Sequence, residues 1–297
     1  MGGLVGVVGL GAIGEPMAEN ALAAGFATVV FYTRREPLDR LAARGARIAR
    51  SVEELGSACS VVQLVVGHDA QLEAVVRGAS GNAGLAASMA RGATVLVHST
   101  VHPDTVARVA TWLGERGIAV LDAPVSGDHG AEASARARAM TFMIGGPASV
   151  LDAVRPLLEA SGQRLYHLGE VGAGTLTKLA ANAMTLVAME STREALRLLR
   201  RAGIDAKTAL EVWRHTSGCS WAVENWERMH EMAARHPGGR QGLTDLGYKD
   251  LSHALAVAHR LEVPLALASL VSQLMEPRFG EEWAAAEAPL AGPLGKR

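Results

Sequence analysis

The chain has 297 residues, and its 29 Lys and Arg against 30 Asp and Glu give a formal net charge of -1 at pH 7. Hydrophobic residues make up 49% and charged residues 20%, a globular rather than a disordered composition. The balanced charge, without a basic run, argues against a nucleic-acid-binding protein. Two cysteines, Cys59 and Cys219, are too few for a disulfide framework or a zinc site.

No segment of the sequence has the pattern of a secretion signal or a membrane span. The apolar N-terminus lacks a basic n-region and leads directly into a glycine-rich turn. The most apolar interior stretch, residues 179–189, contains Asn182 and is much shorter than the ~20 residues of a membrane-spanning helix. We therefore expect a soluble, cytoplasmic protein with no membrane or nucleic acid among its partners.

Short valine-rich runs alternate with amphipathic stretches over the first half of the chain. The runs are continuously apolar, which is typical of strands covered on both faces. Strands alternating with helices predict an α/β domain with a doubly wound parallel sheet, the Rossmann architecture, over residues 1–168. The expected strands span residues 4–8, 28–32, 61–66, 94–98, 119–122, 141–144 and 164–167.

Three helix starts in this half carry recognisable signals. Ser51 and Glu54 form a capping box, and Asp104 precedes a helix over residues 105–116. Pro147 opens a helix over residues 148–160.

Strand signals largely vanish after Gly174. Residues 175–202 predict one long helix, because apolar positions recur at helical spacing and Gly203 is a natural end. We expect an all-helical domain over residues 169–297. Its other expected features are helices over 206–216 and 250–261, a loop at 236–242 and a frayed tail from Pro289.

The first strand ends in the turn Gly9-Leu10-Gly11-Ala12-Ile13-Gly14, which opens a helix over residues 15–24. Gly9 allows the tight turn, Gly11 lets the backbone approach a pyrophosphate, and Gly14 lets helix and strand pack closely. The helix N-terminus offers N–H groups to the phosphates. A plain strand-to-helix turn is the alternative, but the position in the first βαβ unit favours a dinucleotide site.

The residues at the end of the second strand indicate which dinucleotide, NAD or NADP, the protein binds. NAD-preferring sites usually place an Asp or Glu there, whereas this chain has Thr33-Arg34-Arg35. A hydroxyl and two guanidinium groups suit a 2′-phosphate, so the sequence predicts NADP as the cofactor. A solvated basic turn is the alternative for either arginine.

Five separated motifs carry a family resemblance that covers nearly the whole chain. They resemble the β-hydroxyacid dehydrogenase family, which includes 3-hydroxyisobutyrate dehydrogenase, tartronate semialdehyde reductase and glyoxylate/succinic semialdehyde reductases. The motifs are GLGAIGEPMAEN at 9–20, His98-Ser99-Thr100 with Val101 and Pro103, DAPVSG at 122–127, GAGTLTKLAANAM at 172–184, and Lys249-Asp250-Leu251.

The resemblance implies an active site between the two domains and a homodimer or homotetramer formed through the helical domain. It implies that the backbone at Ser126 and Gly127 binds a substrate carboxylate, and that Lys178 is the general acid/base, assisted by Asn182. Lys249 would close over cofactor and substrate. The residues implied on the nicotinamide side are Val66, Gly67 and Thr100.

These assignments are physically reasonable, although each has a simpler alternative. Lys178 and Asn182 share one helix face, and a lysine in an apolar stretch is costly without a task or partner. It could instead extend to the surface. Ser126-Gly127 follows a strand end, where open sheets bind ligands, but could be an ordinary turn. Lys249 could be a solvated residue at a helix start.

Several departures from the family pattern lie on the substrate side and leave the substrate open. Asp128 stands where a second glycine is usual, and residues 133–138 lack a customary glycine. Ala181, Gly67 and Gly242 also replace common family residues.

The sequence thus predicts an NADP-dependent oxidoreductase that acts on a small β-hydroxy acid, semialdehyde or keto acid. One alternative is a related imine reductase, although such enzymes generally replace the lysine. Another is a non-catalytic NADP-binding relative. No metal is expected, because the histidines do not pair at ligand spacing.

Overall fold

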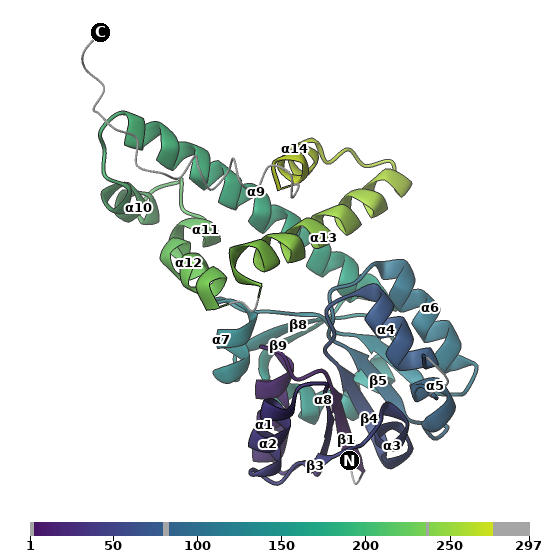
Figure 1. Cartoon of the computed structure of the whole chain (residues 1–297). Helices are drawn as coiled ribbons and strands as arrows, with labels where there is room; N and C mark the ends of the chain where they lie inside the picture. Colours follow the sequence, from purple (N-terminus) through teal and green to yellow (C-terminus); the bar gives the residue numbers. More distant parts are fainter. Residues whose placement is uncertain (1–2, 80–82, 236–237, 276–297) are drawn as a thin grey trace. The chain divides into compact units, whose positions relative to one another are not determined.

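The computed structural model describes residues 3–79, 83–235 and 238–275 (Figure 1). The chain divides into two compact units, Met1–Lys178 and Leu179–Arg297. Each unit is described by itself below.

A six-stranded parallel sheet forms the centre of the first unit. Its strand order is β3-β2-β1-β4-β5-β6, so the order reverses between β1 and β4. This is the Rossmann arrangement, in which ligands bind beyond the carboxyl ends of the strands at the reversal. The strands are β1 (Leu4–Val8), β2 (Thr28–Phe31), β3 (Arg47–Ile48), β4 (Cys59–Leu64), β5 (Thr94–Val97) and β6 (Ala119–Asp122).

Helices cover both faces of this sheet (Figure 1). One face packs against α3, α4, α5 and α6, and the other against α1, α2 and α8. Burial on both faces explains why these strands are continuously apolar in sequence. The helices are α1 (Gly14–Ala23), α2 (Arg35–Ala42), α3 (Val52–Ala58), α4 (Asp69–Arg77), α5 (Leu85–Ser88), α6 (Pro103–Gly114), α7 (Ala131–Arg136) and α8 (Ala148–Glu159).

The last strands of this unit form a second, three-stranded sheet of β7 (Val125–Ser126), β8 (Met140–Ile144) and β9 (Gly162–His167). The expectation that β8 and β9 continue the parallel sheet is wrong. Only two residues separate β6 from β7, too few for a parallel crossover, and β8 returns antiparallel to β7. Strand β9 is mostly exposed, so it is not covered on both faces either.

The helix starts follow the sequence signals with two corrections. Ser51 caps α3 by accepting from the N–H of Glu54, but the Glu54 carboxylate accepts from the N–H of Arg50 rather than completing a reciprocal box. Helix α6 begins at Pro103, and its cap is the His102 ring, which accepts from the N–H of Asp104. Helix α8 begins directly after Pro147, as predicted.

The described part of the second unit is helical. The long helix is confirmed, and Gly203 follows it in a left-handed conformation with φ of 79°. The loop prediction for 236–242 is wrong over 239–242, because Gly242 donates to the carbonyl of Gly238 inside α13. The helices are α9 (Ala173–Arg201), α10 (Ala206–Arg214), α11 (Trp221–Glu224), α12 (Trp226–Arg235), α13 (Gly239–Arg260) and α14 (Ala266–Met275).

Residues 236–237 and the predicted tail from Pro289 lie outside the described residues. In the described ranges, no helix combines the length and the apolar character that crossing a membrane requires.

Candidate active site

The glycine turn after β1 has the geometry that a dinucleotide needs. Gly9 has φ of 93°, and its N–H donates to Phe31 at the end of β2 over 3.1 Å. A Cβ on Gly9 would overlap the carbonyl oxygen of Val65, and one on Gly14 would overlap the carbonyl oxygen of Gly9. A Cβ on Gly11 would meet no atom within 4 Å. The turn therefore leaves open space where a pyrophosphate can approach the backbone, and NAD(P) fits it.

The remaining turn residues contribute through the backbone. The Leu10 side chain is fully buried in the core, whereas Ala12 is exposed. Ile13 is the N-cap residue of α1, and its side chain makes no capping hydrogen bond to the first N–H groups of the helix. These N–H groups are the donors that helix N-termini offer to phosphates.

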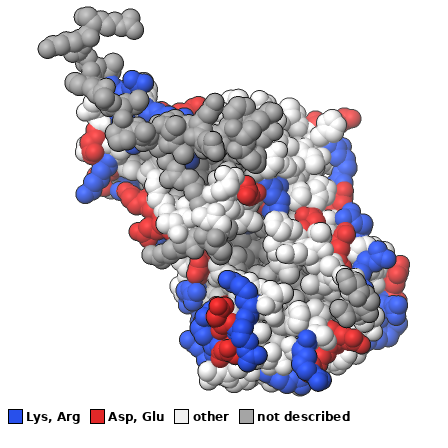
Figure 2. Space-filling model, in the orientation of Figure 1, with Lys and Arg blue, Asp and Glu red and all other residues white. Residues whose placement is uncertain are grey.

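An ion pair fixes the cofactor helix α1 to α2. Arg40 donates to both carboxylate oxygens of Glu15, at 2.6 and 2.9 Å. Glu15 is buried, and its hydrogen bond with Arg40 holds the pKa of the carboxyl below its usual value. Arg44, just after α2, and Glu19 of α1 form a second ion pair, at 3.3 Å. On the face shown in Figure 2, basic and acidic side chains are interspersed.

The three residues predicted to hold a 2′-phosphate lie exposed at the end of β2. Arg34 donates to the hydroxyl of Tyr32 over 3.1 Å, and its guanidinium lies 5.2 Å from the centre of the Tyr32 ring. Arg35 pairs with Asp39 at 2.8 Å along α2. The bond from Gly9 to Phe31 brings the end of β2, two residues before Thr33, beside the glycine turn.

The residues expected on the nicotinamide side lie beyond β4 and β5. The N–H of Val66 donates to Ser99 Oγ over 2.8 Å, which joins the chain after β4 to the residue preceding Thr100. The N–H of Gly67 donates to the Gln71 side chain over 2.9 Å. Adjacent strand ends thus bring Val66 and the segment of Thr100 together, beside the reversal in strand order.

His98, in the same motif as Thr100, is a core residue. Its ring is bonded to the carbonyl of Ala123 at 2.7 Å and to the Gln63 side chain at 3.1 Å. Complete burial lowers the pKa of His98 to about 4, so the ring is neutral near pH 7. His98 ties three strand ends together and does not reach a ligand site.

The predicted carboxylate loop begins at β7. Ser126 pairs with Thr141 of β8, and Gly127 lies so close to Ser134 of α7 that a Cβ would overlap the Ser134 hydroxyl. Asp128, the departure from the family pattern, forms an exposed ion pair with Arg164 of β9 at 3.0 Å. The loop is thus held from α7 and from β9.

Asp122, at the end of β6, is a buried carboxylate to which the sequence assigned no role. Its two oxygens accept from the N–H groups of Gly172 and Thr175, at 2.8 and 2.6 Å, at the start of α9. Burial raises the pKa of Asp122, and these N–H groups oppose that rise. The only sequence signal for it is its place in the DAPVSG motif.

Lys178 and Asn182 both lie on α9, one turn apart and half-buried. In the second unit, Asn182 donates to Asp250 Oδ2 over 2.7 Å, and Lys249 Nζ lies 3.1 Å from Asp250 Oδ1. Lys249 is inside α13 with its side chain 16% exposed, so the alternative of a solvated helix start is wrong. Asp250, which the sequence left without a role, joins two predicted site residues.

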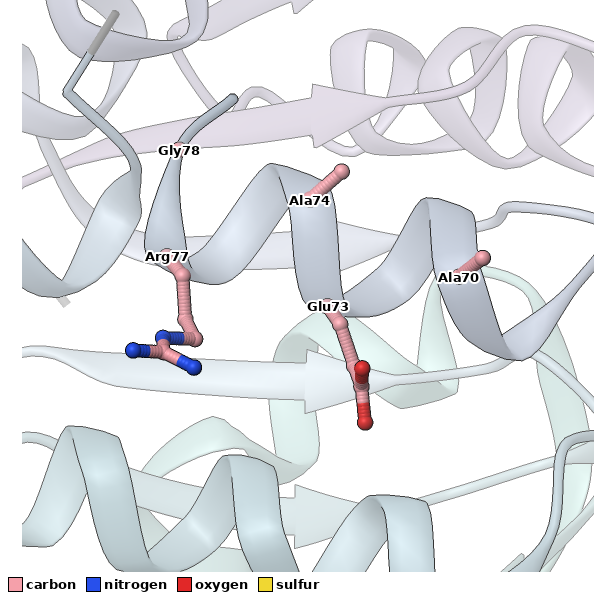
Figure 3. Close-up of a pocket in the computed structure, with 5 residues that line it drawn as sticks. All are labelled: Ala70, Glu73, Ala74, Arg77 and Gly78. Carbon is pink, nitrogen blue, oxygen red and sulfur yellow. The ribbon is translucent and has the colours of Figure 1, made fainter. Parts of the chain in front are cut away.

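A shallow depression on α4 contains none of the predicted site residues. It has a volume of about 400 Å³ and is lined by Ala70, Glu73, Ala74, Arg77 and Gly78 (Figure 3). Glu73 pairs with Arg108 at 2.7 Å, and the Arg77 guanidinium lies 4.7 Å from the centre of the Trp112 ring. Both of its charged side chains are therefore engaged with the protein. Among the described residues, no group of three His, Cys, Asp or Glu is placed to hold a metal.

Comparison with known proteins agrees with this geometry. Residues 4–169 match the NAD binding domain of 6-phosphogluconate dehydrogenase. Residues 172–286 match the NAD-binding domain of NADP-dependent 3-hydroxyisobutyrate dehydrogenase. The NAD-dependent L-serine dehydrogenase of Pseudomonas aeruginosa is 35% identical over 274 residues, covering 91% of this chain and 90% of the relative.

Two solved structures share the fold over almost the whole chain. 3-Hydroxyisobutyrate dehydrogenase of Salmonella typhimurium has a TM-score of 0.81 and 29% identity, covering 92% of this chain and 93% of its own. The Mycobacterium tuberculosis 3-hydroxyisobutyrate dehydrogenase with L-serine has a TM-score of 0.78 and 25% identity, covering 98% and 96%.

The Rossmann sheet and its glycine turn define an NAD(P)-binding oxidoreductase. The two family models together match both halves of the chain. The chain belongs to the β-hydroxyacid dehydrogenase family, as its motifs indicated.

Proposed function

We propose that the protein is an NADP-dependent dehydrogenase that transfers a hydride between the nicotinamide and a small β-hydroxy acid or the corresponding semialdehyde or keto acid. The observation that carries the proposal is the arrangement on α9. Lys178 lies one turn before Asn182, whose amide is held by the buried carboxylate of Asp250. A proton-transferring amine beside a fixed amide suits the interconversion of an alcohol and a carbonyl.

Lys178 acts as the general acid/base. In reduction its ammonium donates a proton to the carbonyl oxygen, and in oxidation its neutral amine accepts the hydroxyl proton. Bound NADP(H) supplies or accepts the hydride. Asn182 uses one amide proton on Asp250, which leaves its carbonyl oxygen and second amide proton to orient Lys178 or the substrate oxygen.

The loop of Ser126 and Gly127 binds the substrate carboxylate. The support is its position beyond a strand end, where N–H groups and a hydroxyl are available, and the close packing of Gly127 on Ser134 that fixes its backbone. Relatives named for L-serine and 3-hydroxyisobutyrate act on β-hydroxy acids, which favours this class of substrate.

Preference for NADP rests on Arg34, with Thr33 and Arg35 beside it. The L-serine dehydrogenase of Pseudomonas aeruginosa is NAD-dependent, so the cofactor preference of this protein depends on its own residues. No carboxylate occupies positions 33–35 to bind a ribose 2′-hydroxyl. Arg35 is paired with Asp39, which makes Arg34 the main donor to a 2′-phosphate.

We further propose the domain boundary near residue 168 and a homodimer or homotetramer formed through the helical domain. Exposed leucines on one face of α14 support a protein contact there. They are Leu267, Leu270 and Leu274, exposed by 67%, 54% and 38%. Sedimentation of the protein at several concentrations tests this, and a monomer throughout would contradict it.

A substrate screen tests the proposed function. L-Serine and 3-hydroxyisobutyrate are offered with NADP⁺ and with NAD⁺, and glyoxylate, succinic semialdehyde and a cyclic imine with NADPH. The proposal expects turnover of a carboxylated alcohol or aldehyde and a higher kcat/KM with NADP(H). Turnover of the imine alone would instead identify an imine reductase.

A further inference from the structure

The carboxylate of Asp122 connects β6 to a helix that lies far along the chain. Asp122 is 0% exposed, and its oxygens accept from the N–H groups of Gly172 and Thr175, 50 and 53 residues later. Its own backbone exchanges two hydrogen bonds with Gly145, at 3.1 and 2.8 Å. Both ends of the residue are therefore fixed.

Helix capping is ordinarily local, and the cap then holds the helix only to its own preceding loop. Here the negative charge comes from the neighbouring strand and satisfies N–H groups at the positive end of α9. Asp122 consequently fixes where α9 begins relative to the end of β6. Both oxygens act as acceptors, which is what the ionised carboxylate offers.

Two proposed site elements extend from this anchor. Lys178 is three residues beyond Thr175, about 4.5 Å along the helix axis. Ser126 is four residues beyond Asp122 on the strand side. All these residues lie within the unit Met1–Lys178. A displacement of the first turn of α9 would therefore change the distance between the lysine and the loop that holds the substrate.

We propose that Asp122 is a positioning residue for catalysis, because it sets the place of Lys178 against the Ser126–Gly127 loop. This inference rests on the proposed role of Lys178. General acid/base transfer depends on short contacts, and an error of about 1 Å in placement costs about 10²-fold in rate.

The test begins with Asp122→Asn, which keeps the size of the side chain. One of the two N–H donors then faces an NH₂ group, and the other faces a neutral oxygen, which is a weaker acceptor than a carboxylate oxygen. We expect kcat to fall by about 10²-fold, with the KM for NADPH changed by less than about 2-fold, since the glycine turn is not touched. The matched control is Asp205→Asn. Asp205 caps α10 through Thr208 over 2.9 Å and should leave kcat unchanged.

A double-mutant cycle separates positioning from general damage. If Asp122 acts through Lys178, Asp122→Asn has little further effect on the residual rate of Lys178→Ala. The inference would be overturned if Asp122→Asn lowered kcat by the same factor in the wild type and in Lys178→Ala. It would also be overturned if Asp122→Asn alone left kcat unchanged. Wild-type turnover in Lys178→Ala would instead refute the proposed function, whatever Asp122→Asn does.

A second variant covers the case in which the amide does not fold. Asp122→Ser is smaller, introduces no competing donor of fixed direction and leaves room for water at the N–H groups. The same loss in kcat is expected, with circular dichroism and NADPH affinity close to those of the wild type. Full activity in folded Asp122→Ser would overturn the inference.

Discussion

The glycine turn of the first unit and the Asn182–Asp250–Lys249 cluster of the second are built in opposite ways. The turn consists of six consecutive residues, and its glycine pattern is visible in one short stretch of sequence. The cluster joins α9 to α13 through a hydrogen bond between residues 68 positions apart. Cofactor binding is thus encoded locally, whereas the proposed proton-transfer site depends on helix packing.

This contrast implies that cofactor and chemical functions can be removed separately. Lys178→Ala should lower kcat by about 10²–10⁴-fold, the usual contribution of general acid–base catalysis. NADPH affinity should survive, because the glycine turn is intact. Lys178→Arg should restore little, since a guanidinium barely deprotonates. Steady-state kinetics and NADPH titration measure both effects.

Lys207→Ala provides the control for Lys178→Ala, because Lys207 is an exposed lysine on α10. Its kcat should match that of the wild type. Retained turnover in Lys178→Ala would remove the lysine from the mechanism.

His98 predicts a pH effect that belongs to the first unit and not to catalysis. Its pKa is about 4 in the folded protein against 6.5 for an ordinary histidine, so the unfolded chain binds the extra proton between these values. Stability from this group is present above pH 6.5 and is lost as pH falls toward 4, by about 3 kcal/mol.

Urea unfolding at pH 7 and pH 4 measures the effect in the wild type and in His98→Gln. The variant should lose less stability on acidification, because it lacks the titrating ring. His259→Gln, at an exposed position of α13, is the control. Equal acid sensitivity in wild type and His98→Gln would contradict the assignment.

Arg34→Ala tests whether Arg34 recognises the 2′-phosphate of NADPH. Removing a charge-assisted contact to the 2′-phosphate should cost about 1.5–3 kcal/mol in NADPH binding, with little change for NADH and for kcat. Arg35→Ala should have a smaller effect, because Arg35 is engaged with Asp39. An equal loss of NADPH and NADH affinity in Arg34→Ala would show that Arg34 does not recognise the 2′-phosphate.

The same contrast explains how much the sequence predicted. Five of the six parallel strands and the long helix carry strong local patterns, whereas β3 has only two residues and was not expected. The positive φ of Gly9 and the close contacts at Gly9 and Gly14 agree with the tight turn and the close packing expected there, and the role of Gly11 toward a pyrophosphate stays a prediction. The second sheet was missed because β7 has only two residues and its antiparallel pairing with β8 is a tertiary contact. The start of α13 was missed because the glycines at 238, 239 and 242 are typical of a loop in sequence. The helix there has a side-chain hydrogen bond from Gln241 to Asp245, which the sequence did not indicate.

Within the candidate site, the family motifs indicated which residues to expect. They did not indicate the hydrogen bonds and ion pairs that fix the positions of these residues. Asp122 and Asp250 stand inside those motifs, yet Asp122 accepts hydrogen bonds from residues 50 and 53 positions away, and Asp250 accepts one from Asn182, 68 positions away. Periodicity and spacing describe one segment at a time. A carboxylate that links two segments becomes visible only when the chain is folded.

The most direct test of the central claim is to compare a β-hydroxy acid with its own methyl ester. L-Serine and L-serine methyl ester differ only in the group that the Ser126–Gly127 loop is proposed to bind. With NADP⁺ at saturation, the account predicts clear turnover of the acid and a kcat/KM for the ester lower by about 10-fold or more, because the ester loses a charge-assisted contact. If the 3-hydroxyisobutyrate pair is the one turned over, the same ratio is predicted there. An ester oxidised as efficiently as the acid would contradict the account.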